Sequence, residues 1–110
     1  MSALALEVSS QVPAPRLTID LAAVAANTRT IADATPGELM AVVKADGFGL
    51  GAAEVARTAL LHGATRLGVT SLAEAFALRD AGLRAPVLSW LNPVDAAWQD
   101  AVDEDVDVAV

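Results

Sequence analysis

The residue in this sequence best suited to covalent chemistry is Lys44, the only lysine among 110 residues. It follows an apolar run at residues 39–43 that is typical of a buried strand, and glycines stand at positions 47, 49 and 51. Partial desolvation at a strand end favours the neutral amine, a nucleophile that forms a Schiff base with an aldehyde. The glycines would let the backbone turn sharply beside a bulky ligand. The plain alternative, a solvated lysine before an ordinary turn, remains open on spacing alone.

Two phosphate-binding motifs do not fit this stretch. A P-loop places its lysine after the glycines, whereas Lys44 precedes them. The dinucleotide fingerprint needs Gly-x-Gly-x-x-Gly, and here the third glycine comes one residue too soon. The glycine spacing therefore does not predict a mononucleotide or dinucleotide site.

The elements that would position Lys44 follow from the apolar pattern. Strands are expected at residues 16–19, 39–44, 66–69, 87–91 and from 106 onward, and helices at 21–35, 51–61, 71–81 and from Asn92-Pro93 onward. Asp20 suits the N-cap of the first helix, and Thr70 or Ser71 caps the third, where Ser71 as the cap would form a capping box with Glu74. Strands and helices in alternation with short connections indicate a parallel α/β protein.

Several single residues receive a structural interpretation. Glu54 and Arg57 are expected to pair on the outer face of their helix. His62, the only histidine, is expected to end that helix rather than to act in catalysis, because it lies at the opposite end of the unit from Lys44. Phe76 and Trp98 are expected to pack against the core.

Composition excludes some classes of partner and site. The chain is 55% hydrophobic, and its net charge of −7 argues against nucleic acid or an anionic membrane as a partner. It has no cysteine, which excludes disulfides and cysteine metal sites and fits a cytoplasmic location. No secretory signal or membrane-spanning stretch is visible. The acidic residues at 103–105 and 107 are interpreted as a solvated turn, so no metal is expected.

The segment around Lys44 resembles the pyridoxal-phosphate signature of the alanine racemase family. Residues 42–51 read VVKADGFGLG, and the family signature is close to VVKA, Asn or Asp, Ala or Gly, then YGHG. The resemblance extends to LTIDL at 17–21, LGVTSLAEA at 67–75 and AGLRAPVL at 81–88. It therefore covers the chain from about residue 16 to its end.

Two positions depart from the family signature. Phe48 stands where the family usually has a tyrosine whose hydroxyl contacts the cofactor phosphate, so that contact is lost here. Leu50 stands where histidine is common, and it is interpreted as a tolerated loop change. Trp90, near the end of its strand, has two interpretations, namely packing in the core or forming a wall of the cofactor pocket.

The resemblance implies a function. Lys44 would hold pyridoxal phosphate as a Schiff base and act as the acid/base on one face of alanine, while a tyrosine from the other subunit of a homodimer serves the opposite face. Phe48 and Trp90 are the further cofactor-binding candidates. The implied product is D-alanine, a peptidoglycan precursor. Because the sequence contains no tyrosine, this polypeptide alone is expected to racemise alanine poorly or not at all.

The resemblance also implies an incomplete fold. The family has a (β/α)₈ TIM-type barrel, which takes roughly 250 residues, whereas this chain can supply about four strand–helix units. We expect a flexible leader at residues 1–15 and the N-terminal part of the barrel at 16–110, that is, a fragment. An open sheet of this kind exposes an unpaired edge and is expected to self-associate.

Two other functions stay open. The first is another pyridoxal-phosphate barrel, either an amino-acid decarboxylase or a non-catalytic cofactor-binding protein. The second is a non-enzymatic α/β module that keeps only the scaffold. The product of the reaction separates the first from a racemase, and replacement of Lys44 with unchanged ligand binding would favour the second.

Overall fold

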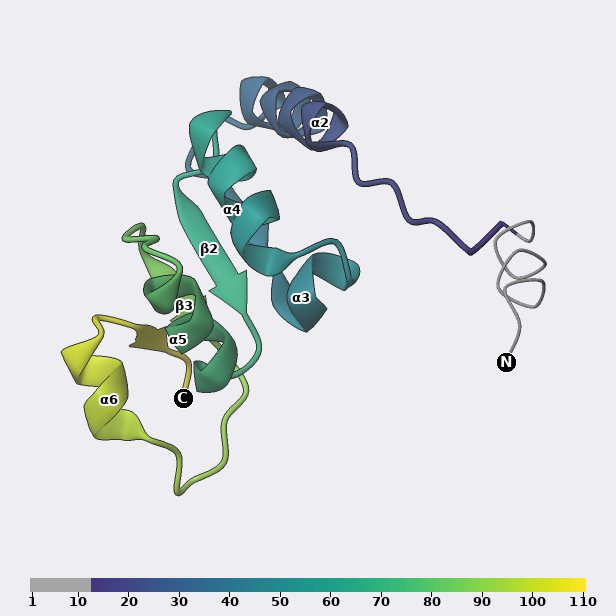
Figure 1. Cartoon of the computed structure of the whole chain (residues 1–110). Coiled ribbons are helices and arrows are strands. Elements are labelled where there is room, and N and C mark those ends of the chain that lie inside the picture. Colours follow the sequence, from purple (N-terminus) through teal and green to yellow (C-terminus); the bar gives the residue numbers. More distant parts are fainter. Residues whose placement is uncertain (1–12) are drawn as a thin grey trace, which may run out of the picture.

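The computed structural model describes residues 13–110 of the chain. In chain order these form α2 (Leu21–Ala34), β1 (Met40–Val42), α3 (Lys44–Phe48), α4 (Ala52–Leu61), β2 (Arg66–Val69), α5 (Leu72–Asp80), β3 (Val87–Ser89), α6 (Trp98–Asp103) and β4 (Asp107–Val108) (Figure 1). Most of the expected leader, residues 1–15, lies outside the described residues. Within the described part, no helix has both the length and the apolar character needed to cross a bilayer.

The strands form one parallel sheet in the order β1-β2-β3-β4. Val42 pairs with Gly68, Gly68 with Leu88, and Leu88 with Asp107, so these residues make one row across the sheet. Parallel neighbours need a crossover connection, which α4 supplies between β1 and β2, and α5 between β2 and β3. The prediction of a parallel α/β chain is confirmed.

The core lies between one face of the sheet and the helices α4 and α5. Its fully or nearly fully buried side chains come from the strands and from the facing sides of these helices: Val43, Leu67, Val69, Val87, Ala56, Leu72, Ala75 and Leu78. The alanines let the helix backbones approach the sheet closely. Phe76 packs against this cluster, as predicted.

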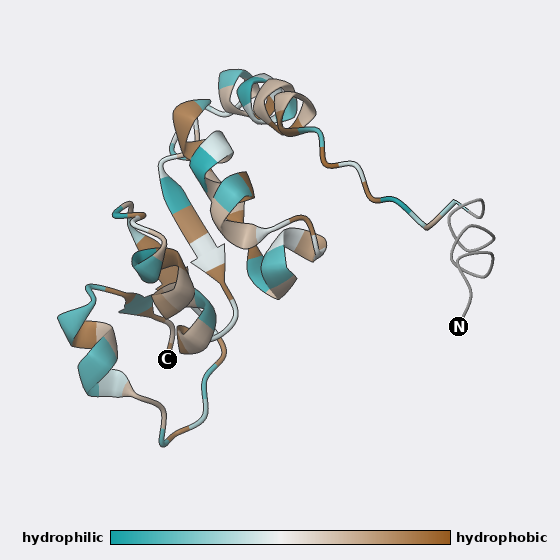
Figure 2. Ribbon diagram, viewed as in Figure 1, coloured by the Kyte–Doolittle hydropathy of each residue, from teal (hydrophilic) through white to brown (hydrophobic). Residues whose placement is uncertain are grey.

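The opposite face of the sheet is more open. In a strand, successive side chains point to opposite faces, so the neighbours of core residues point away from the helices. Val42 accordingly is 45% exposed although it lies inside a strand. Figure 2 shows the change of polarity along β2, which begins with a polar residue and continues with apolar ones.

The helix ends follow their sequence signals closely. Asp20 accepts a hydrogen bond from the amide of Ala23 at 3.1 Å and so caps α2. Ser71 and Glu74 form the predicted capping box of α5. His62 ends α4, and its Nδ1 lies 2.8 Å from the carbonyl oxygen of Thr58.

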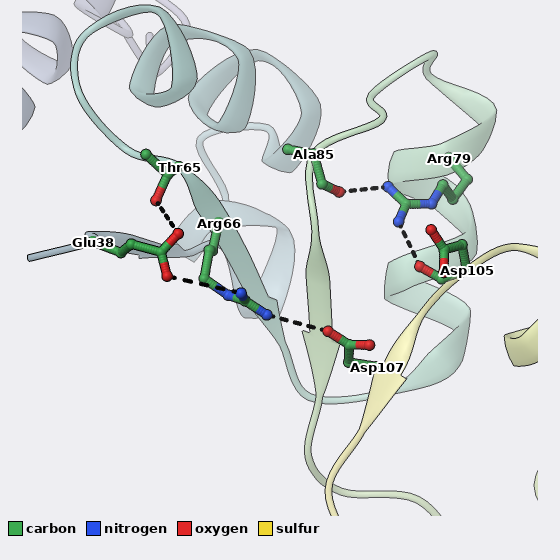
Figure 3. Close-up of polar contacts among 7 residues, drawn as sticks. All are labelled: Glu38, Thr65, Arg66, Arg79, Ala85, Asp105 and Asp107. Carbon is green, nitrogen blue, oxygen red and sulfur yellow. Dashed lines mark hydrogen bonds and ion pairs between the residues drawn. The ribbon is translucent and has the colours of Figure 1, made fainter.

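Arg79 holds together two connections at the amino ends of β3 and β4, a role that its sequence position does not reveal. Its side chain is only 4% exposed. The guanidinium donates to the carbonyl oxygens of Leu83, Ala85, Glu104 and Asp105 at 2.8–3.0 Å, so its contacts join the turn after α5 to the turn after α6 (Figure 3). Rigid, forked donors of this kind suit several fixed acceptors at once, which a lysine could not satisfy.

A second set of polar contacts links side chains at the amino ends of the strands. Arg66, the first residue of β2, donates to Asp107 Oδ2 at 3.1 Å, and its other nitrogen lies 4.0 Å from Glu38 Oε2 (Figure 3). The predicted pair of Glu54 and Arg57 also forms, at 2.6 Å on the outer side of α4. Such exposed pairs contribute little, about 0–1 kcal/mol each.

Two expectations about elements and one about a buried side chain were wrong. Residues 16–19 form no strand, because no neighbouring strand lies beside them to complete a ladder. The last helix begins at Trp98 instead of at Pro93, because Asn92 is engaged in side-chain contacts and the chain turns at residues 94–95. Trp98 is 37% exposed, so it is not a core residue.

We expect replacement of Arg79 by leucine to lower the free energy of unfolding by about 3 kcal/mol. The change leaves four carbonyl oxygens without their shared donor in a poorly hydrated place. Urea unfolding followed by circular dichroism measures the effect. The matched control is Arg84→Leu, at an exposed arginine nearby, which should change stability by less than about 0.5 kcal/mol. Equal effects of the two substitutions would contradict this role of Arg79.

Candidate active site

Lys44 lies where the chain leaves the carboxyl end of β1. The preceding residue, Val43, is buried in the core, and its amide donates to the carbonyl oxygen of Gly68 at 2.9 Å, which ties it to β2. Thr70 and Trp90 leave the sheet at the same edge, after β2 and β3. This edge is where parallel α/β folds carry their reactive groups. Lys44 itself is half-buried.

The turn that follows Lys44 is the segment labelled α3, and its backbone is left-handed. The φ angles are +54° at Ala45, +54° at Asp46, +62° at Gly47 and +59° at Phe48. Only one of these residues is a glycine, and each of the others pays roughly 1–2 kcal/mol for this conformation. The sequence predicted a turn from its glycines, but it gave no sign that alanine, aspartate and phenylalanine would adopt positive φ angles as well.

Hydrogen bonds from three sides compensate this strain. The amide of Gly47 donates to the carbonyl oxygen of Val43 at 2.9 Å. Asp46 accepts three times, because its carbonyl oxygen receives the amides of Gly51 at 2.9 Å and Gly49 at 3.1 Å, and its Oδ1 receives the amide of Ala52 at 2.8 Å. Asp46 therefore satisfies a free amide at the start of α4 while it fixes the turn.

Glu74 connects the same turn to the next strand. Its Oε2 accepts the amide of Ala45 at 2.8 Å, and its Oε1 accepts the amides of Thr70 and Ser71 at 3.0 Å each. Partial burial of Glu74 raises the pKa of its carboxyl group, but the hydrogen bonds from Ser71, Ala45 and Thr70 lower it further, and the net pKa lies below its ordinary value. The carboxylate is therefore held in its ionised form.

Phe48 lies beside the amine of Lys44. The Nζ atom of Lys44 is 5.0 Å from the centre of the Phe48 ring, within the range of a cation–π contact. The ring is 74% exposed at the end of the left-handed turn. It offers a flat apolar surface but no hydroxyl, so it has no donor for a phosphate group.

Trp90 covers part of the open face of the sheet. A methyl group built on Gly68 would lie 2.8 Å from Cζ3 of Trp90 and 2.7 Å from Sδ of Met40, so both side chains cross over this glycine. Trp90 thus extends along the face that lies away from the helices. Its backbone amide continues the ladder, donating to the carbonyl oxygen of Val69 at 3.3 Å.

A buried polar network behind this edge was not predicted. Ser89 is fully buried, and its hydroxyl donates to the carbonyl oxygen of Thr70 at 2.9 Å. Asn92 donates to the Ser89 hydroxyl at 2.8 Å and accepts the amide of Leu72 at 2.9 Å. The network fixes the carboxyl ends of β2 and β3 relative to each other. The Asn-Pro pair was interpreted as a helix start, which hid this role.

The described residues contain no group of three or more acidic or histidine side chains placed to hold a metal ion. The acids at 103–105 and 107 instead lie in the last turn of α6, the loop after it and β4, where Asp105 has a φ angle of +55°. The interpretation of these acids as a turn agrees with this arrangement.

We expect Gly68→Ala to displace Trp90. The added methyl group meets Trp90 and Met40 well inside contact distance, and overpacking of this kind costs about 1–3 kcal/mol. In a Trp98→Phe background, the fluorescence maximum of Trp90 should move to longer wavelength as the indole becomes more exposed. Gly37→Ala is the control, because nothing lies within 4 Å of its added methyl group. An unchanged emission spectrum for Gly68→Ala would refute the close approach.

We expect Glu74→Gln to remove part of the pH dependence of stability. A lowered pKa in the folded state stabilises the fold above the ordinary value of 4.5, and this contribution disappears as pH falls through the folded-state pKa. The unaltered chain should therefore be the more stable protein at pH 7, and the difference from Glu74→Gln should shrink in acid. Urea unfolding at a series of pH values measures this, and a constant difference would exclude it.

Comparison with known proteins supports the resemblance to the alanine racemase family. Residues 19–110 match the family model described as alanine racemase, N-terminal domain. The alanine racemase of Mycolicibacterium smegmatis is 48% identical over 103 residues, which cover 89% of this chain and 26% of that protein.

Solved structures of alanine racemases also superpose on this chain. The alanine racemase from Streptomyces coelicolor A3(2) superposes with a TM-score of 0.80 at 45% identity and covers 84% of this chain and 25% of its own. The enzyme from Streptomyces lavendulae gives a TM-score of 0.82 at 42% identity, covering 84% of this chain and 24% of its own. The chain therefore spans about a quarter of the length of these relatives. Its sheet corresponds to the N-terminal part of a TIM-type barrel, as the resemblance implied, and the chain belongs to the alanine racemase family.

Proposed function

We propose that this chain is the segment of an alanine racemase that holds pyridoxal phosphate through Lys44. The observation that carries the proposal is the placement of the only lysine at the carboxyl edge of the sheet, at the start of a turn that three sets of hydrogen bonds keep fixed. Membership of the family supports it. On this proposal residues 16–110 form the partial barrel domain, and interconversion of L- and D-alanine is the activity of the whole enzyme.

The residues at this edge fit the cofactor in part. Lys44 supplies an amine for the aldehyde, and its partial exposure leaves room for an incoming group. Phe48 and Trp90 offer aromatic surfaces in the segments that follow β1 and β3, and we propose both as cofactor contacts. Phe48 offers no donor in place of the family's tyrosine hydroxyl, so we propose that the phosphate is held mainly by groups outside this chain.

Pyridoxal phosphate, when bound, acts as an electron sink that makes the α-proton of an amino acid easier to remove. The contribution of this chain is the Nζ atom of Lys44. With cofactor and substrate bound, Nζ of Lys44 would be the group that accepts or returns the α-proton on one face of alanine. The fixed turn after Lys44 limits where this atom can move, which favours transfer on a single face.

Racemisation needs a second proton carrier on the opposite face. The sequence has no tyrosine, so the family's usual group must come from another polypeptide segment. We propose a homodimer of the whole enzyme as its source, and the cytoplasm, which the absence of cysteine fits, as its location. The product D-alanine would serve peptidoglycan synthesis.

A trapping experiment tests the proposal. We expect borohydride reduction in the presence of pyridoxal phosphate to fix the cofactor on Lys44, detected by intact mass and by peptide mapping. Because the chain has one lysine, the α-amine of the N-terminus is the only other primary amine that can react. Lys44→Arg is the matched control, since it keeps the positive charge and should leave only the N-terminal adduct. Equal labelling of both proteins would disprove the assignment.

The alternatives predict other products. A decarboxylase would release carbon dioxide and an amine, and a non-catalytic protein would bind the cofactor without converting alanine. The purified 110-residue chain is expected to convert L-alanine to D-alanine poorly or not at all even when Lys44 carries the cofactor, because the opposite-face group is absent. Chiral chromatography of the alanine pool measures this, and substantial conversion would show that a second acid/base is present in the chain.

A further inference from the structure

Glu74 does more than a helix cap requires. A capping box needs one side-chain oxygen to reach back to the amide of the N-cap residue, and Oε1 of Glu74 meets this need through Ser71. A glutamine would serve equally well in that role. The second oxygen, Oε2, reaches a residue 29 positions earlier in the chain, the one directly after Lys44.

This contact connects two separate parts of the site. Oε2 accepts the amide of Ala45 at 2.8 Å, and Oε1 accepts the amide of Thr70 at 3.0 Å. One carboxylate therefore fixes the exits of β1 and β2 relative to each other. Hydrogen bonds to an ionised carboxylate are about twice as strong as those between neutral groups.

The contact also acts where the left-handed turn begins. Ala45 is the first residue with a positive φ angle, and it lacks the conformational freedom of glycine. Its amide faces Glu74, so this hydrogen bond sets the direction in which the backbone leaves Lys44. Loss of the contact would let residue 45 relax to a negative φ angle and turn the lysine away from its present direction.

We propose that Glu74 is a positioning residue, whose carboxylate holds the backbone after Lys44 in its left-handed form and so aims the lysine amine at the cofactor. The inference rests on the proposed function of Lys44. It assigns to Glu74 no contact with the cofactor or the substrate. Its effect should appear in how readily Lys44 reacts, separately from the stability of the fold.

The test compares Glu74→Gln with Ser71→Ala. The glutamine can keep an oxygen toward Thr70 and Ser71, but its NH₂ group then opposes the amide of Ala45, so the capping box survives and the link is lost. Ser71→Ala removes the hydroxyl that accepts the amide of Glu74 at 3.2 Å and leaves the link in place. Both variants are made in the full 110-residue chain.

Three quantities are measured for each protein. They are the hydrogen exchange of the Ala45 amide, the rate of borohydride-trapped labelling of Lys44 by pyridoxal phosphate, and the midpoint of urea unfolding. We expect Glu74→Gln to speed exchange at Ala45 and to slow labelling about tenfold, as loss of a charge-assisted hydrogen bond predicts. Ser71→Ala should lower the unfolding midpoint and leave exchange at Ala45 and labelling of Lys44 unchanged.

The outcomes separate this inference from the one on which it rests. If the unaltered chain gives no adduct at Lys44, the proposed function fails and the role of Glu74 fails with it. If the unaltered chain is labelled and Glu74→Gln is labelled at the same rate, only the role of Glu74 is overturned. The same holds if both variants slow labelling in proportion to their loss of stability, because that result describes a general structural effect.

Discussion

The left-handed backbone after Lys44 is the constraint on which the arrangement of the site depends. Residues 45–48 have positive φ angles in succession, and three of the four are not glycine. At roughly 1–2 kcal/mol for each of the three, this conformation persists only because its surroundings hold it. The holding groups come from β1, from the start of α4 and from α5. The position of the lysine amine is thus a property of the whole unit, since strand, sheet neighbour and two helices must be in place together.

The sequence allowed prediction of the elements whose signals are local. Ser71 and Glu74 marked the start of α5, and the apolar runs marked the strands of the sheet. The segment around Lys44 also carried the family signature. The expected strand at residues 16–19 failed because alternation cannot report whether a partner strand is present. Pro93 failed as a helix start because tertiary contacts of Asn92 outweighed a local preference.

The contacts of Arg79 and Glu74 could not be predicted from the sequence, because their partners are backbone atoms. Arg79 binds four carbonyl oxygens, and every residue has a carbonyl oxygen, so the sequence gives no sign of which ones it will meet. The link from Glu74 to the amide of Ala45 was missed for the same reason. The left-handed turn was interpreted as a flexible glycine segment, whereas the described structure shows it as a closely hydrogen-bonded one. Contacts between a side chain and a distant main chain need the fold itself to be seen.

The sheet divides its charges between its two ends. At the amino ends Arg66 pairs with Glu38 and Asp107, and Arg79 donates to main-chain oxygens that precede β3 and β4. At the carboxyl ends the cation is Lys44, which lies beside the ring of Phe48, and Trp90 follows the neighbouring strand β3. The guanidinium groups of Arg66 and Arg79 thus make ion pairs and hydrogen bonds within the fold, whereas the carboxyl edge carries an amine.

This division has a consequence for chemical selectivity. Six of the seven cationic side chains are arginines, whose guanidinium groups remain protonated and are poor nucleophiles toward aldehydes. A reactive carbonyl compound that meets the folded protein therefore finds a single nucleophilic side chain of this type, and it is the one placed at the carboxyl edge of the sheet. No other lysine side chain competes with Lys44 for such a compound. The same feature exposes the site to modification, because any acylating or carbonyl-bearing metabolite that modifies a side-chain amine must react with Lys44.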